Sequence, residues 1–160
     1  DQGFSLEFAT SVLMVLMVFG AFGRIFGGIL GDRIGALPGY ILMSLGQTIF
    51  VIWFPDLISP TTIYIMAALF GFTYSGVMSS ILVCTRMMVP ANYGARAMSL
   101  TSFFGWIGMG LGGFLGGYFF DIYGNYNWAF TFAGLSGVIN LIILSFFFLY
   151  IRRAERLVLN

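Results

Sequence analysis

The sequence contains no lysine and no histidine, one cysteine, and few charged residues of any kind. Charged residues make up 8% of its 160 residues, against roughly 25% in ordinary soluble domains. The single thiol, Cys84, cannot form a disulfide within the chain, and no Cys/His cluster has the spacing of a metal site. The missing histidine also excludes Ser-His and Cys-His pairs for covalent catalysis. These absences argue against an enzyme, a metal centre, a cofactor and a nucleic-acid partner.

What the sequence does contain is apolar residues, which make up 59% of it and gather in five long stretches. A helix needs roughly 20 predominantly apolar residues to cross a bilayer. The links between the stretches are short and rich in glycine, proline, asparagine and aspartate, which favour turns. The sequence therefore predicts an all-α integral membrane protein without a soluble domain. Its five spans are expected at about residues 6–31, 38–54, 61–88, 97–120 and 128–151.

In a topology of five spans, all seven basic residues fall on the same side of the membrane or in the half of a span nearest to that side. The links after the second and fourth spans carry Asp56 and Asp121 and no basic residue. Short loops rich in arginine are retained on the cytoplasmic side of a membrane. The pattern therefore predicts a protein of the plasma or bacterial inner membrane, with its first residue outside and its last residue in the cytoplasm. The basic residues are Arg24, Arg33, Arg86, Arg96, Arg152, Arg153 and Arg156.

Glycines recur at every fourth residue in parts of the first and fourth spans. In a bilayer such ridges allow helix backbones to approach closely, because lipid provides no hydrophobic drive for helices to associate. We interpret them as helix-packing positions, either in a static contact or in surfaces that slide in a moving protein. The ridges include Gly23 and Gly27 in the first span, and Gly108, Gly112 and Gly116 in the fourth.

The end of the first span carries a short charged motif. Gly28, Asp32, Arg33 and Gly35 stand in the pattern G-x-x-x-D-R-x-G, which resembles the loop signature of the major facilitator superfamily. In that family the motif follows the second helix and recurs more weakly after the eighth. Because four spans follow the motif here, the resemblance implies helices eight to twelve, which are five of the six helices in the C-terminal half of the fold.

Two further segments carry the same resemblance. Residues 89–97 resemble the family's link between helices ten and eleven, and residues 112–126 resemble the end of its eleventh helix. The resemblance implies that residues 1–160 form a single partial transmembrane domain. Because the first residue, Asp1, is also not methionine, we expect a fragment of a larger chain, whose missing N-terminal half is its partner in transport.

The resemblance also implies a role for the motif residues. In the family the loop aspartate contacts a neighbouring helix end and holds the outward-open state closed on the cytoplasmic side. We therefore expect Gly28, Asp32, Arg33 and Gly35 to act as a conformational gate and not as substrate ligands. Ordinary anchoring at the membrane interface is the alternative interpretation.

Arg24 is the basic residue that lies inside a span. It is expected roughly 10 Å from the cytoplasmic end of that span, at 1.5 Å per residue. An unpaired charge at such a depth costs at least about 2.5–3.5 kcal/mol, so it should face a cavity or a partner. The guanidinium group of an arginine can form two parallel hydrogen bonds to a carboxylate, and it stays positively charged across the physiological pH range. The position, eight residues before Asp32, resembles the anion-binding arginine of the oxalate/formate antiporters and monocarboxylate transporters. The alternatives are that Arg24 extends to the cytoplasmic interface or pairs with a carboxylate in the missing part.

Aromatic residues supply the other candidate substrate contacts. Phe70 and Tyr74 are one helical turn apart and resemble the aromatic pair that lines the carboxylate cavity of the oxalate exchanger, although such spacing is also typical of simple packing. Trp106, like Tyr74, carries a polar group that needs a partner when buried. Gln47 and Asn140 are expected to bond to neighbouring helices and not to substrate.

The prediction is secondary active transport of a small, monocarboxylate-like organic anion by alternating access. The oxalate exchanger pairs its arginine with a lysine in helix eleven, and this chain has no lysine, which favours a monocarboxylate over a dianion. No acidic residue lies deep in a span, so the chain belongs to an antiporter or leaves proton coupling to the absent half. The alternatives are a carrier of another solute, such as a sugar acid or a drug, with Arg24 structural, and a non-transporting membrane receptor or scaffold.

Overall fold

Five long helices run through the residues described by the computed structural model, 4–57 and 59–158. Each is long and apolar enough to cross a membrane, and no strand occurs in these ranges. The expectation of an all-α integral membrane fold is confirmed. The helices are α1 (Leu6–Ile34), α2 (Ala36–Trp53), α3 (Pro60–Met88), α4 (Gly94–Tyr123) and α5 (Asn127–Val158), with single 3-10 turns at Phe54–Asp56 and Ala91–Tyr93.

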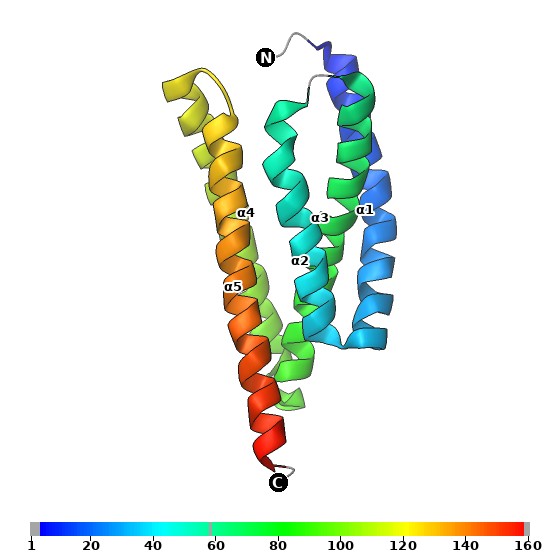
Figure 1. The fold of residues 1–160 in the computed structure, drawn as a ribbon, viewed down its shortest axis with the longest axis vertical. Coiled ribbons are helices and arrows are strands. Elements are labelled where there is room, and N and C mark those ends of the chain that lie inside the picture. The colour runs from blue at the N-terminus through cyan, green and yellow to red at the C-terminus, as the bar shows by residue number, and fades with distance from the viewer. Residues whose placement is uncertain (1–3, 58, 159–160) are drawn as a thin grey trace.

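The helices lie side by side along the long axis of the molecule (Figure 1). The most extensive contact is between α1 and α3, and α2 packs against both α3 and α5. By comparison, α4 touches its neighbours α3 and α5 only sparsely. The described chain starts at one end of the molecule and finishes at the other, as an odd number of crossings requires (Figure 1).

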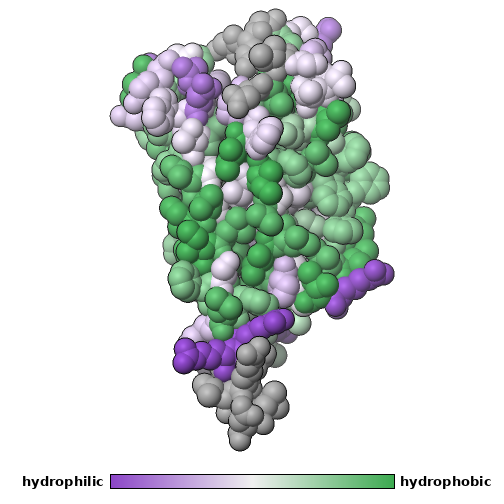
Figure 2. Space-filling view, in the orientation of Figure 1, coloured by the Kyte–Doolittle hydropathy of each residue, from purple (hydrophilic) through white to green (hydrophobic). Residues whose placement is uncertain are grey.

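The face of the molecule shown in Figure 2 is apolar along its middle, and its hydrophilic residues lie towards the two ends. The end of α1, the end of α3, the start of α4 and the end of α5 share one end of the molecule, and they carry every described arginine except Arg24. The opposite end carries Glu7 and Asp121. Which end faces the cytoplasm stays a prediction. The side chains of Asp56 and Arg156, which that prediction also uses, lie outside the described part of the structure.

The link between the first two helices is shorter than expected. The sequence predicted a polar link over residues 31–37, but α1 continues to Ile34 and α2 begins at Ala36. Only Gly35 separates them. Its φ of +98° is open to glycine because glycine has no Cβ, and its N–H donates a hydrogen bond of 3.0 Å to the carbonyl of Gly31. Pro38 therefore falls in the first turn of α2, where a missing N–H breaks no helical hydrogen bond.

Glycines bring the backbones of α1 and α3 together. A Cβ atom added at Gly23 would overlap the backbone carbonyl of Phe72, and one added at Gly27 would lie 2.8 Å from the carbonyl oxygen of Gly76. On the opposite helix, a Cβ atom added at Gly71 would overlap the carbonyl of Leu16. The contact is therefore as close as two helix backbones allow, and any larger residue at these positions must push the helices apart.

The glycine ridge of α4 does not pack in the same way. A Cβ atom added at Gly108, Gly112 or Gly116 would meet nothing within 4 Å. The physical reason is that α4 has few contacts with α3 and α5 and is exposed along nearly its whole length. No described residue packs closely against these three glycines, although the sequence predicted helix packing there. Packing against a further helix stays a prediction.

We predict that Gly23→Ala destabilises the protein, because its new Cβ atom has no space against Phe72. Overpacking of this kind costs about 1–3 kcal/mol. The measurement is thermal unfolding of the purified protein in detergent. Gly28→Ala is the matched control on the same helix, since a Cβ atom there would meet nothing within 4 Å. Equal destabilisation by the two substitutions would contradict the close contact between α1 and α3.

Candidate functional site

Arg24 lies on α1 outside its contact with α3. Because α1 extends to Ile34, the residue is about 15 Å from the end of its helix, deeper than the sequence suggested. Its side chain is exposed and makes no hydrogen bond or ion pair with any residue the structure describes. One turn further along, Gly28 leaves open space, whereas Gly20, one turn before, is filled by the side chain of Ser75. The guanidinium group therefore has open volume on one side.

Phe70 and Tyr74 form a stacked pair on α3. Their ring centroids are 5.7 Å apart with an angle of 18° between the planes. The hydroxyl of Tyr74 donates to the sulfur of Met109 on α4 at 3.9 Å, and Phe54 packs edge-on against Phe70 at 6.1 Å. The pair therefore lies on the side of α3 that faces α4.

Trp106 stands apart from these residues. It lies on α4 and its side chain is 73% exposed. The cavities described below include Phe70 but not Arg24, Tyr74 or Trp106. Within the described chain the four predicted substrate contacts do not form one enclosed site, and their role in substrate binding stays a prediction.

A cavity of about 560 Å³ lies between α2, α4 and α5, with Phe70 contributing from α3. The glycine ridge of α4 forms one of its walls, so the backbone there is accessible to anything the cavity holds. The polar side chains of its lining come from α2 and α5 and are Ser44, Gln47, Thr48, Ser136 and Asn140. Such a lining is suited to hydrogen bonding with a small polar molecule and holds no charged group.

Asn140 joins α5 to α2 at this cavity. Its amide nitrogen donates a hydrogen bond of 2.8 Å to the hydroxyl oxygen of Ser44, and its amide oxygen accepts one of 3.5 Å from the hydroxyl of Tyr40. The expectation of a bond to a neighbouring helix is confirmed for Asn140, whereas Gln47 makes no side-chain hydrogen bond with any described residue. Sequence reasoning missed that Asn140 and Gln47 also line a cavity. The sequence did contain a signal for this polar face. Gln47 and Thr48 lie three and four residues after Ser44, and these spacings place the side chains on one face of a helix.

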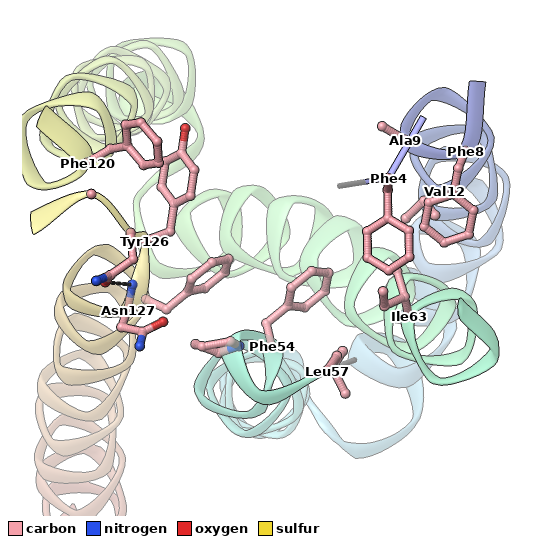
Figure 3. Close-up of a pocket in the computed structure, with 14 residues that line it drawn as sticks. Phe4, Phe8, Ala9, Val12, Phe54, Leu57, Ile63, Phe120, Tyr126 and Asn127 are labelled. Atoms are coloured by element: carbon pink, nitrogen blue, oxygen red, sulfur yellow. Dashed lines mark hydrogen bonds between the residues drawn. The ribbon is translucent and has the colours of Figure 1, made fainter. Parts of the chain in front are cut away.

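A second cavity, of about 450 Å³, lies at the end of the molecule where α1 starts. Figure 3 shows aromatic rings from three parts of the chain around it. Phe54 stacks on Phe130 with ring centroids 5.5 Å apart, and Phe120 stacks on Tyr126 at 4.7 Å. Among the side chains that the structure describes, those that line this cavity are mainly aromatic and aliphatic, and none is charged.

The expected gate residues lie at the end of α1 that bears the cations. Asp32 and Arg33 fall in the last turn of α1 and not in a loop, and both are exposed. Neither makes an ion pair or a side-chain hydrogen bond among the described residues. Gly35 provides the one-residue turn, and Gly28 leaves open space. The contact with a neighbouring helix end that the resemblance implied is absent from this part of the chain, so the gate stays a prediction.

We predict that Asn140→Ala lowers the stability of the protein, because it removes both hydrogen bonds between α5 and α2. Interhelical hydrogen bonds in membrane proteins contribute about 0.6 kcal/mol each on average. Reversible unfolding in mixed micelles measures the change. Gln47→Ala is the matched control, since Gln47 lines the same cavity but has no hydrogen-bond partner among the described side chains. An equal loss in the control would contradict the structural role of Asn140.

Two comparisons with known proteins found a match to this chain. A sequence model of the family described as Major Facilitator Superfamily matches residues 1–159. Riboflavin transporter MCH5 of Saccharomyces cerevisiae is 34% identical over 86 residues, which cover 52% of this chain and 16% of that protein. The chain thus matches only a small part of that relative's length. No solved structure matches the chain.

Proposed function

The chain belongs to the major facilitator superfamily, and we propose that it is the C-terminal part of a secondary active carrier for a small organic anion. The carrier works by alternating access and exchanges monocarboxylate-like solutes. Residues 1–160 correspond to helices eight to twelve, with the first residue outside and the last in the cytoplasm. The family membership, the five helices long enough to span a membrane and the single deep arginine support this proposal.

Arg24 is the observation that carries the proposal. A guanidinium group about 15 Å from its helix end is costly without a partner, and Arg24 has none among the described residues. A carboxylate in the adjacent open space at Gly28 would complete a charge-assisted, two-pronged hydrogen bond. Arg24 thus recognises the negative charge of the substrate.

A single positive charge favours a monoanion. The chain has no lysine that could supply a second charge near Trp106. The stacked rings of Phe70 and Tyr74 offer an apolar surface for the rest of a small substrate, with the hydroxyl of Tyr74 at its edge. Phe70, Tyr74 and Trp106 therefore shape the substrate space, and Arg24 provides its charge.

The missing N-terminal half completes the site. Family carriers of this type bind substrate between two halves of the fold. Arg24 on α1 and Trp106 on α4 are both exposed in the described chain, on surfaces that a partner half would cover. The ridge of Gly108, Gly112 and Gly116, which lines the cavity between α2, α4 and α5, offers a further surface for a helix of the complete protein.

A second candidate is a carrier of a neutral polar solute with an aromatic ring system. The relative named as a riboflavin transporter motivates it, and so does the cavity between α2, α4 and α5. That cavity combines the amides of Gln47 and Asn140 with the ring of Phe70, and none of the described residues that line it is charged. In this candidate function Arg24 is structural.

Transport by the complete protein in proteoliposomes separates the two candidates. We expect labelled formate or lactate to exchange, and Arg24→Ala to reduce exchange at least about ten-fold, because hydrogen bonds to charged groups contribute about 1.5–3 kcal/mol. Arg24→Lys keeps the charge but loses the fork, so its activity should be intermediate. Arg96→Gln, which alters an exposed arginine in the first turn of α4, is the control.

Three results would contradict this proposal in part or in whole. Exchange of a monocarboxylate that survives Arg24→Ala would leave Arg24 a structural residue. Uptake of riboflavin, without exchange of any carboxylate, would instead establish the second candidate. A folded complete protein that moves neither solute would point to a receptor or scaffold built on this fold.

The proposed gate makes a separate prediction. We expect Asp32→Asn to lower the maximum exchange rate several-fold while changing KM much less, because Asp32 acts on the conformational step and not on the substrate. Initial rates over a range of substrate concentrations provide both values. Asp121→Asn, at the opposite end of the molecule, is the matched control. A raised KM with an unchanged maximum rate, or no effect at all, would contradict a gating role.

A further inference from the structure

A crevice of about 260 Å³ lies between α2, α3 and α5 at the end of the molecule that bears the arginines. Seven of the eight residues that line it are apolar, and the eighth is Arg152. The start of α2 forms one wall, the end of α3 a second, and α5 the third. The lining consists of Ala36, Leu37, Pro38, Met87, Met88, Phe148, Ile151 and Arg152.

The walls of this crevice belong to the packed part of the molecule. Ala36 and Leu37 are buried and belong to the hydrophobic core cluster. Phe148 and Ile151 are partly buried and pack against that cluster. The one-residue turn at Gly35 places the first turn of α2 directly after α1, so this wall is held by a short connection. Met87 is 69% exposed, so the crevice is open to its surroundings on the side of α3.

Arg152 is the one charged residue among the described residues of the lining. Its guanidinium carbon lies 4.6 Å from the centre of the ring of Phe148, which also lines the crevice. Arginine side chains near a helix end extend their charged group towards the headgroup layer while their stem covers apolar surface. Arg152 stands at the end of the apolar stretch of α5 that is long enough to cross a membrane, beside an apolar crevice.

The electrostatic surroundings favour an anion at this point. Arg33, Arg86, Arg96 and Arg153 share this end of the molecule with Arg152. Asp32 is the one acidic residue there whose side chain the structure describes. Basic crevices between membrane helices are typical sites for anionic lipid headgroups.

We propose that this crevice binds an anionic phospholipid. The phosphate of the lipid pairs with Arg152, and one acyl chain lies along the apolar walls formed by Leu37, Met87 and Phe148. A free phosphate fits less well, because the described lining offers it no polar side chain besides Arg152. A zwitterionic lipid would fill the slot but gains less from the excess of arginine. None of the residues that line the crevice is a proposed substrate contact.

Lipid-dependent thermal stability tests this proposal. The purified protein in mixed micelles is titrated with phosphatidylglycerol, with phosphatidylcholine, and with water-soluble glycerol phosphate. We expect phosphatidylglycerol alone to raise the unfolding temperature in a saturable way. Arg152→Gln should weaken the apparent affinity about five-fold, the equivalent of the ~1 kcal/mol that one basic residue contributes near an anionic surface.

Two further variants separate the crevice from general surface charge. Met87→Trp fills the mouth of the crevice from an exposed position, so it should fold normally and lose the response to phosphatidylglycerol. Arg153→Gln removes a neighbouring exposed arginine that does not line the crevice, and it should retain the response within two-fold.

Three outcomes would overturn the proposal. An equal response to phosphatidylcholine would remove the role of the phosphate charge. An equal response to glycerol phosphate would mean that a phosphate site, and not a lipid site, is present. Equal losses in Arg152→Gln and Arg153→Gln, with Met87→Trp unaffected, would mean that the lipid responds to the net charge of this end of the molecule and not to the crevice.

Discussion

The close approach of the α1 and α3 backbones is the constraint on which the rest of the structure depends. Lipid solvates apolar side chains as well as protein does, so helices in a membrane associate through close packing and not through the hydrophobic effect. Gly23 and Gly27 on α1 meet Phe72 and Gly76 on α3 with no space for a Cβ atom. Because this contact fixes the rotation of α1, it also places Arg24 outside the contact, with its side chain exposed.

A second joint, between α2 and α5, depends on polar contacts. Asn140 bonds to Ser44 and Tyr40, and these bonds hold α5 against α2. The contact between α1 and α3 and the contact between α2 and α5 together involve four of the five helices. The fifth, α4, contacts its neighbours sparsely although it is rich in glycine. Glycine therefore permits close packing but does not by itself provide a partner, and the partner decides whether a ridge is buried.

Two arginines illustrate how position determines the ligand that a cation can bind. Arg24 lies deep in α1 next to the open space at Gly28, where a small carboxylate could complete its hydrogen bonds. Arg152 lies near the end of α5 over Phe148, above an apolar slot of a kind that suits an acyl chain. Two residues of the same type therefore have different proposed roles, because their depths and their neighbours differ.

Much of the fold was predictable from the sequence. Five apolar stretches of membrane-spanning length lead to helices, because every backbone group must be hydrogen-bonded within lipid. All five helices were predicted to within a few residues, apart from the long extension of α5 to Val158. The motif from Gly28 to Gly35 also indicated the family before any comparison.

The sequence by itself thus determined the number and type of the elements, the family, and the end of the molecule at which the arginines gather. Tertiary structure decided which faces meet. It reduced the first link to Gly35, turned the ridge of Gly108 and Gly112 towards a cavity, and brought Asn140 to Ser44. Helices that are apolar all round carry little information about their rotation. Which residues become neighbours therefore depends on contacts between helices far apart in the chain.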